Sequence, residues 1–182
     1  NNDSAYETAI SLFKKGINIK AVVDNREEID SKLIKETEKN NIKVYKGYTV
    51  VNTFGYKRIN KISIMQLSKD GQKVVGSKKT IACDCLGVSG GWTPAVHLFT
   101  QSSGKLKFRD DDQVFIPNIY PSDQISIGSC NGDFTLDEIL LNISKVLKEF
   151  LNVKKTDYEN LEVHSSFNKS KRNIWLLPSD KI

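Results

Sequence analysis

The sequence predicts an α/β protein that combines a parallel sheet with an antiparallel β-meander. Between residues 5 and 45, amphipathic helix patterns alternate with short apolar strand patterns, as expected for a parallel sheet. Between residues 48 and 79, three strand-like runs are separated by Phe54-Gly55 and Asp70-Gly71, and Asp-Gly between strands is typical of a hairpin. Residues 80–94 then read as one further, buried strand.

The first half of the chain contains two helix signals and two strand signals in alternation. Ser4 and Glu7 form a capping-box pattern, and apolar residues follow at helical spacing. The expected elements are a helix over residues 5–15, a strand over 17–24 that closes on Asp24, a helix from 30 or 31 to 40 or 41, and a strand over 42–45. Such strands are expected to lie parallel, with right-handed crossovers.

The stretch over residues 80–94 predicts a central strand. Its residues are small or apolar on both faces, Asp84 excepted, as required when helices cover both sides of a sheet. The stretch runs into Ser89-Gly90-Gly91, and open α/β sheets bind ligands beyond the carboxyl ends of their strands. We therefore expect this strand to end beside a ligand.

A second informative turn joins a predicted strand over residues 124–128 to a long helix that ends near Leu151. Thr135 and Glu138 form a capping box, and an apolar stripe follows at helical spacing. A turn of small residues before a helix N-terminus favours an anion such as pyrophosphate. An ordinary loop, in which Gly128 and Gly132 only turn the chain, explains the same residues equally well.

The segment between these two turns predicts only short elements. One or two helical turns are expected within residues 94–100, and short extended pieces over residues 105–108 and 114–116.

The composition excludes several classes of protein. The 182 residues include 27 Lys and Arg against 22 Asp and Glu, but the basic residues are scattered, so nucleic-acid binding is disfavoured. No apolar run approaches the length of a membrane span, and three cysteines indicate a reduced, cytoplasmic compartment. The chain opens on a helix signal without a methionine, so we expect it to be part of a longer polypeptide.

No pair of acid and base, activated nucleophile or metal-ligand spacing is visible, so no catalytic residue and no metal site are expected. Asp24 could accept hydrogen bonds from a ribose, but capping the next loop is the favoured interpretation. Cys83 and Cys85 are expected to be buried small hydrophobes, and Trp92 and Trp175 to pack or to contact other subunits. His97 and His164, the two histidines, have no neighbouring nucleophile or carboxylate at a telling interval.

Four segments in order resemble the α subunit of heterotetrameric sarcosine oxidases. They cover residues 1–6, 21–26, 83–98 and 128–132, so that the resemblance extends over about residues 1–151. The most specific part is Ser-Gly-Gly-Trp at residues 89–92, which is followed by Pro94 and by His97-Leu98.

The resemblance implies the fold of pyridine nucleotide–disulfide oxidoreductases, with two dinucleotide-binding domains of the Rossmann type. It also implies a subunit that carries noncovalent NAD and assembles with β, γ and δ subunits, with FAD in the β subunit and FMN near the contact between α and β. Such enzymes oxidise sarcosine to glycine. Two alternatives stay open: a non-catalytic assembly scaffold, or a subunit of a related opine or hydrogen-cyanide-synthase-type dehydrogenase.

Read through this resemblance, the chain has three parts. Residues 1–112 are a partial nicotinamide-nucleotide-type domain with the meander, residues 113–151 return to the first dinucleotide-binding domain, and residues 152–182 are a linker or docking arm. In the first part, Asn1-Asn2-Asp3-Ser4 stands where a glycine-rich turn would be needed, which disfavours a nucleotide there.

The expected NAD site therefore lies in the second part. Its predicted contacts are Gly128, Ser129, Asn131, Phe134 and Leu136. Many flavoproteins of this group have an aspartate after the glycine of the late strand. The neutral Ser129 at that position fits NAD better than a flavin nucleotide.

Overall fold

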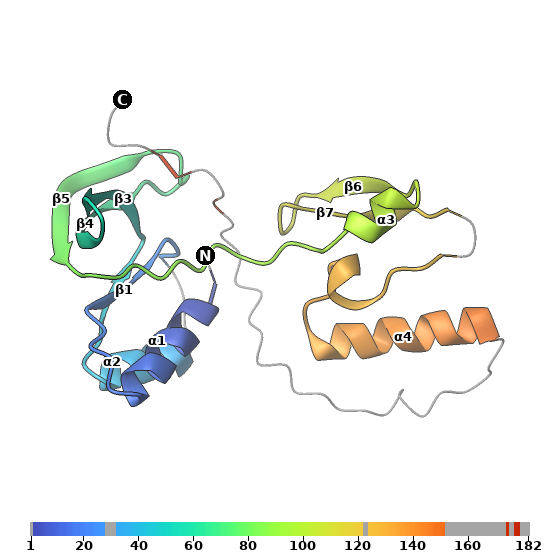
Figure 1. Cartoon of the computed structure of the whole chain (residues 1–182), viewed down its shortest axis with the longest axis horizontal. Coiled ribbons are helices and arrows are strands. Elements are labelled where there is room, and N and C mark those ends of the chain that lie inside the picture. Colours follow the sequence, from blue (N-terminus) through green and yellow to red (C-terminus); the bar gives the residue numbers. More distant parts are fainter. Residues whose placement is uncertain (1, 28–31, 122–123, 152–173, 175–176, 179–182) are drawn as a thin grey trace. The chain divides into compact units, whose positions relative to one another are not determined.

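The computed structural model describes residues 2–27, 32–121, 124–151, 174 and 177–178, and the chain forms two compact units. Unit 1 comprises Asn1–Gly91 together with Lys169–Ile182, and unit 2 comprises Trp92–Asn168. Figure 1 shows the elements of each unit. The predicted arm over residues 152–182 falls almost wholly outside the described residues.

Unit 1 begins with a small parallel sheet covered by two helices. The elements alternate in order: α1 (Ser4–Lys14), β1 (Ala21–Asp24), α2 (Lys32–Lys39) and β2 (Lys43–Lys46). β1 and β2 pair in parallel, as predicted, with Val22 opposite Val44. The core between helices and strands consists of Tyr6, Ala9, Val22, Ile34 and Ile42. Burial of each large apolar side chain contributes about 1.5–3 kcal/mol, which holds this short sheet against its helices.

The predicted meander follows as a three-stranded antiparallel sheet. Its strands are β3 (Tyr48–Gly55), β4 (Ile59–Leu67) and β5 (Val74–Ala82), in that spatial order. The central strand buries Ile62, Ile64 and Leu67, whereas β5 is almost entirely exposed. The α/β class with an antiparallel meander is therefore confirmed.

Gly47 connects the two sheets of unit 1. It lies between β2 and β3 with a φ of +69°, a conformation that favours glycine. Its N–H donates to the carbonyl of Arg26 at 2.9 Å, and its own carbonyl accepts from the N–H of Leu67 at 2.7 Å. One residue thus ties the turn after β1 to the central strand of the meander.

The predicted central strand over residues 80–94 is wrong. β5 ends at Ala82, and residues 83–96 form neither strand nor helix. Cys85 and Val88 are exposed. No strand within the described residues pairs with this stretch beyond a bond from the Cys83 N–H to the carbonyl of Asn60. An apolar pattern forms a strand only where a neighbour completes the hydrogen bonds.

Unit 2 consists of a hairpin, two short helices and one long helix. The elements are α3 (His97–Gln101), β6 (Lys105–Arg109), β7 (Val114–Ile119), the 3₁₀ helix η1 (Gly128–Asn131) and α4 (Leu136–Leu151). β6 and β7 pair antiparallel across residues 110–113, so the boundary expected at residue 112 falls inside this hairpin, and the units divide at Gly91 instead. The assignment of nucleotide types to the parts stays a prediction.

Two local expectations also differ from the structure. Residues 124–127 are not paired into a strand. The proposed capping box at Ser4 is absent, because Ser4 is already the first residue of α1 and Asp3 is its N-cap, without a side-chain capping bond. In the turn before α1, Asn2 rather than Ser4 provides the side-chain hydrogen-bond acceptor, as described below.

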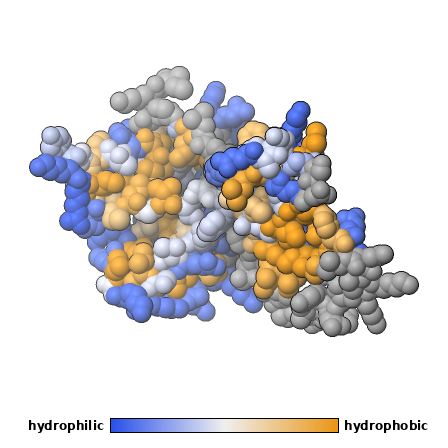
Figure 2. Space-filling view, turned by 45° about the vertical axis from the view of Figure 1, so that its right-hand side comes forward, coloured by the Kyte–Doolittle hydropathy of each residue, from blue (hydrophilic) through white to orange (hydrophobic). Residues whose placement is uncertain are grey.

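Several large apolar side chains of unit 2 face outward. On α4 the exposed members are Leu136, Leu141 and Phe150, and the predicted apolar stripe is only half-buried at Ile139, Leu140 and Ile143. Figure 2 shows apolar side chains, drawn in orange, gathered at the molecular surface. Contiguous exposed apolar area is typical of a surface that other protein covers.

Candidate functional site

The predicted site turn is built on two glycines with left-handed backbones. Gly128 has a φ of +77° and Gly132 a φ of +83°, and η1 lies between them. Gly128 is buried, Ser129 is exposed and Asn131 is half-buried. In this turn Ser129 therefore faces solvent, whereas Gly128 is covered by other residues.

Arg109 fixes the end of this turn. Its Nη2 donates to the carbonyl of Gly132 at 2.8 Å, and its Nε donates to Asp112 at 2.7 Å. Hydrogen bonds that Arg109 donates to the Asp112 carboxylate raise the pKa of Arg109, so the guanidinium stays charged. A Cβ on Gly132 would lie 2.8 Å from both Arg109 and Ile116, so a side chain there would force one of these residues to shift.

Asp133 joins the turn to the long helix. Its Oδ2 accepts from Asn131 Nδ2 at 3.1 Å and from Asn142 Nδ2 at 2.7 Å. Asp133 is buried, and a buried carboxylate that is held by amide donors resists displacement. Asn131 is therefore positioned by a side chain below it.

The start of α4 shows the Thr135 half of the predicted capping box. The Oγ1 of the buried Thr135 accepts from the N–H of Glu138 at 3.4 Å. Phe134 is half-buried and Leu136 is 57% exposed. Asp137 and Glu138 lie in the first turn, so carboxylates already stand at the positive end of this helix.

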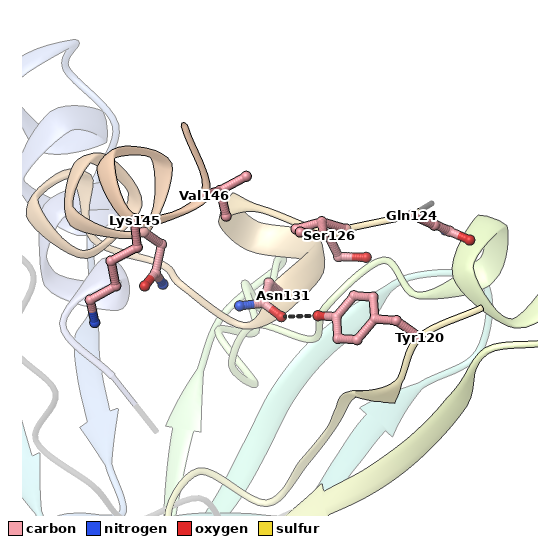
Figure 3. A pocket seen from close by; sticks show the side chains of 8 residues that line it. Tyr120, Gln124, Ser126, Asn131, Lys145 and Val146 are labelled. Atoms are coloured by element: carbon pink, nitrogen blue, oxygen red, sulfur yellow. Dashed lines mark hydrogen bonds between the residues drawn. The ribbon is translucent and has the colours of Figure 1, made fainter. Parts of the chain in front are cut away.

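A cleft of about 420 Å³ opens beside η1, in the size range of ligand pockets. Its lining residues are Tyr120, Gln124, Ile125, Ser126, Asn131, Asn142, Lys145 and Val146. Figure 3 shows Asn131 facing Tyr120, whose hydroxyl donates to Asn131 Oδ1 at 3.0 Å. Of the five predicted site residues, Asn131 alone lines the cleft.

Two lining groups give the cleft its chemistry. Burial raises the pKa of Tyr120, and the charges of Cys130 and Asp133 act in the same direction, so its hydroxyl remains protonated at neutral pH. Tyr120 also stacks edge-on against Phe99 at 5.0 Å between ring centroids. Lys145 projects from α4 as the cationic residue of the lining (Figure 3). The cleft therefore offers an aromatic face, amides and one positive charge.

The earlier turn at the start of α1 is filled by its own side chains. Asn2 Oδ1 accepts from the N–H of Ser4 at 3.0 Å and from the Ser4 hydroxyl at 2.6 Å. The hydroxyl of Ser89 donates to the same oxygen at 2.9 Å. Ser89-Gly90-Gly91, expected to face a ligand, thus begins with a residue that contacts this turn.

A buried charge cluster lies below that turn. Arg26 Nη2 donates to Asp3 and to Asp24 at 2.8 Å each, and the Tyr6 hydroxyl donates to Asp24 at 2.8 Å. The side chains of Arg26 and Asp24 are each 3% exposed. Figure 1 shows α1 and β1, which supply Tyr6 and Asp24, while Asp3 precedes α1 and Arg26 follows β1.

The cluster shifts the pKa of each partner. Burial would raise the pKa of Asp24, but hydrogen bonds from the side chain and backbone of Arg26 outweigh it and hold that pKa below its usual value. Burial would lower the pKa of Arg26, yet its bonds to Asp24 raise it. Burial, reinforced by the Asp24 carboxylate, raises the pKa of Tyr6 far above its usual value. Asp24 is thus an ionised cap of the loop after β1, with both oxygens engaged.

The expected burial of Cys83 and Cys85 is wrong, because the stretch that carries them does not form a strand inside a sheet. His97 is exposed, Cys85 is exposed and Cys83 is half-buried. Trp92 is 55% exposed, whereas His164 and Trp175 lie outside the described residues. Within the described part of the chain, no group of side chains could hold a metal ion, and no helix is long and apolar enough to cross a membrane.

Sequence reasoning missed two groups. The first is the cluster of Asp3, Tyr6 and Arg26, for which the signal was an acid at a strand end with an arginine two residues later. The second is the pair of Tyr120 and Lys145 in the cleft. No local pattern links those two residues, because the fold alone brings them to one cavity.

No family model matches the chain. Two curated relatives are named sarcosine oxidase subunit alpha, from Corynebacterium sp. strains U-96 and P-1. Each is 30% identical, over 131 and 135 residues, which are 72% and 73% of this chain. Among solved structures, thioredoxin reductase of T. acidophilum shares 16% identity with a TM-score of 0.41, over 62% of this chain and 40% of that chain.

The similarity in sequence extends over most of this chain but over a small part of the relatives. The chain spans 13% and 14% of their lengths. Both relatives carry the same name, and the similar segment covers a similar share of each. The chain is therefore a relative of the sarcosine oxidase α subunit, corresponding to one segment of it.

Proposed function

We propose that this chain is a dinucleotide-binding segment of the α subunit of a multi-subunit, flavin-dependent sarcosine oxidase, which demethylates sarcosine oxidatively to glycine. The sequence relationship to two such subunits supports the family of reactions. In the complete enzyme, β, γ and δ subunits would supply the amine site, together with FAD and FMN. The exposed apolar side chains of α4 give those partners a surface to cover.

The observation that carries the NAD assignment is the contrast between the two turns. The turn from Gly128 to Gly132 keeps both glycines at positive φ and leaves Ser129 exposed. In the turn before α1, side chains of Asn2 and Ser4 occupy the same kind of position. A nucleotide backbone can therefore approach the turn from Gly128 to Gly132, whereas side chains block it at the turn before α1.

The charges around η1 decide on which side of the turn the phosphates would lie. Asp137 and Glu138 in the first turn of α4 repel an anion, whereas Lys145 faces the cleft. NAD would therefore run from Ser129 along the cleft, with its phosphates toward Lys145 and a base near the ring of Tyr120.

The cofactor, when bound, supplies a site for hydride chemistry. The described residues themselves provide binding and orientation: the Tyr120 hydroxyl holds Asn131 in place, and Asp133 holds the same amide from below.

A scaffold role is the second candidate, and one observation favours it for unit 1. Among the described residues, the buried cluster of Asp3, Asp24 and Arg26 occupies the carboxyl end of its parallel sheet. Unit 1 would then serve assembly, while unit 2 binds the nucleotide.

The test compares one substitution at each turn in the complete purified assembly. Ser129→Trp places a large side chain at the exposed position of the proposed site, and Asn2→Trp places the same side chain at the filled turn. The readout is NAD released on denaturation, identified by mass and counted per folded assembly. We expect loss of NAD in Ser129→Trp and retention in Asn2→Trp. The reverse result would place the nucleotide in unit 1, and absence of NAD from the wild type would reject the proposal.

A further inference from the structure

We infer that unit 1 carries a built-in ligand: the carboxylate of Asp3 occupies the anion position of a nucleotide crevice, with Arg26 as its receptor. The inference concerns unit 1 alone and does not depend on what unit 2 binds.

The cluster of Asp3, Asp24 and Arg26 lies in the part of the fold where open α/β sheets bind phosphate. α1 precedes β1, and Asp3, the residue just before α1, contacts Arg26, which follows the carboxyl end of β1. In open α/β sheets, ligands bind at the carboxyl ends of the strands, and phosphates bind at the N-terminus of the adjoining helix. Asp3 is the N-cap of α1. Its carboxylate makes no capping bond to the helix N–H groups and lies beside the helix N-terminus against Arg26, which is the cation that an anion at this place would meet.

The contacts of Asp3 are those of a bound anion. Its Oδ1 accepts from Arg26 Nη2 at 2.8 Å, a charge-assisted bond from an arginine that is 3% exposed. The side chain of Asp3 itself is 11% exposed. Burying an arginine so completely requires a compensating negative charge.

Arg26 has spare capacity for a larger anion. Its Nη1 is buried and has no hydrogen-bond partner among the described residues. A guanidinium matches a phosphate through two parallel bonds, whereas Asp3 takes only the bond from Nη2. Arg26 therefore has more N–H donors than its single bond to the Asp3 carboxylate uses.

The remaining features close the crevice against outside anions. Asp3 and Asp24 together place two carboxylates against one guanidinium, so the cluster keeps a net negative charge that repels phosphate. Asn2 also takes the N–H of Ser4, which is one of the donors that a phosphate would need. The crevice is closed because it is already occupied by its own chain.

Removal of the built-in carboxylate should open the site. In the full 182-residue chain, Asp3→Gly deletes the internal anion and supplies a glycine at the turn, while Arg26 keeps its place on Asp24. The probe is inorganic pyrophosphate, measured by titration calorimetry. We expect Asp3→Gly to bind one pyrophosphate more than the wild type, whatever number the wild type binds through unit 2.

The matched control is Asp84→Gly. Asp84 also pairs with an arginine, Arg58, at 3.1 Å, but both side chains are 76% exposed. Its removal should add no pyrophosphate site, since a solvated arginine has no crevice around it.

If Asp3→Gly does not fold without ligand, pyrophosphate should restore its helical circular dichroism, because the added anion replaces the missing carboxylate. Either the additional site or this rescue supports the inference. A folded Asp3→Gly chain with no additional site, or an unfolded one that pyrophosphate does not restore, overturns it. A wild-type pyrophosphate site that is lost in Asn2→Trp but kept in Ser129→Trp would overturn it as well.

Discussion

Arg109 and Gly132 hold each other in one conformation. The Nη2 of Arg109 donates to the carbonyl of Gly132 at 2.8 Å, and a Cβ on Gly132 would lie 2.8 Å from that same nitrogen. The hairpin of β6 and β7 is thereby attached to the turn that begins α4. The geometry of the proposed nucleotide turn depends on a residue that no nucleotide would touch.

The first prediction is that Gly132→Ala destabilises unit 2. A left-handed backbone costs a non-glycine residue roughly 1–2 kcal/mol, and the overlap with Arg109 adds about 1–3 kcal/mol. Gly16→Ala is the control, because Gly16 has a φ of +84° and open space around its Cβ position. Urea unfolding should show the larger loss for Gly132→Ala. Equal losses would mean that the contact with Arg109 adds nothing.

The second prediction concerns the buried cluster. Arg26→Ala leaves the carboxylates of Asp3 and Asp24 buried without their cation, so the free energy of unfolding should fall by about 3–5 kcal/mol. Arg58→Ala breaks an exposed pair with Asp84 and should cost less than about 1 kcal/mol. Urea titrations of both variants measure the difference, and similar small losses would show that the cluster does not stabilise unit 1.

The third prediction is a loss of stability at alkaline pH through Tyr6. Burial and the Asp24 carboxylate raise the pKa of Tyr6, so the folded chain holds this proton more tightly than the unfolded chain. The resulting stabilisation is complete below the ordinary tyrosine pKa of about 10 and is lost as the pH rises above it.

Tyr6→Phe tests this directly. The variant should lose about 1–3 kcal/mol at neutral pH, because Asp24 loses a hydrogen-bond donor, and its stability should decline less steeply above pH ~10. Tyr56→Phe is the control, since Tyr56 is 97% exposed. An unchanged alkaline slope in Tyr6→Phe would contradict the prediction.

The fourth prediction is a difference in reactivity between neighbouring cysteines. Burial raises the pKa of the Cys83 thiol, with the Asp84 charge acting in the same direction, whereas Cys85 is exposed. Iodoacetamide at neutral pH should therefore alkylate Cys85 before Cys83, because the thiolate is the reactive form. Mass spectrometry of digests gives both rates, and Cys83→Ala and Cys85→Ala chains assign them. Faster modification of Cys83 would contradict this order.

Local signals predicted the elements whose stability is local or depends on near neighbours. α1, α2 and α4 were predictable from helical spacing, and the meander from Asp70-Gly71 between strand-like runs. The parallel pairing of β1 and β2 followed from their alternation with helices. These features arise within a few residues of the pattern that indicates them.

Features that need a distant partner were not predictable. The run over residues 83–88 has the composition of a buried strand, but composition cannot say whether a neighbouring strand is present. Likewise, Asp3 and Arg26 are separated by 23 positions, and only the packing of α1 on β1 brings them together. Asn131 was named from its turn, whereas its partner Tyr120 comes from beyond β7.

The hydrogen bonds of Gly47 have a consequence for how unit 1 opens. Because its N–H is bonded to Arg26 and its carbonyl to Leu67, the charge cluster cannot move away from the meander without breaking at least one of these bonds. Amide hydrogen exchange at Gly47 and Leu67 would then report a single cooperative opening that includes both sheets. Gly47 would thus join the parallel sheet and the meander into one folding unit.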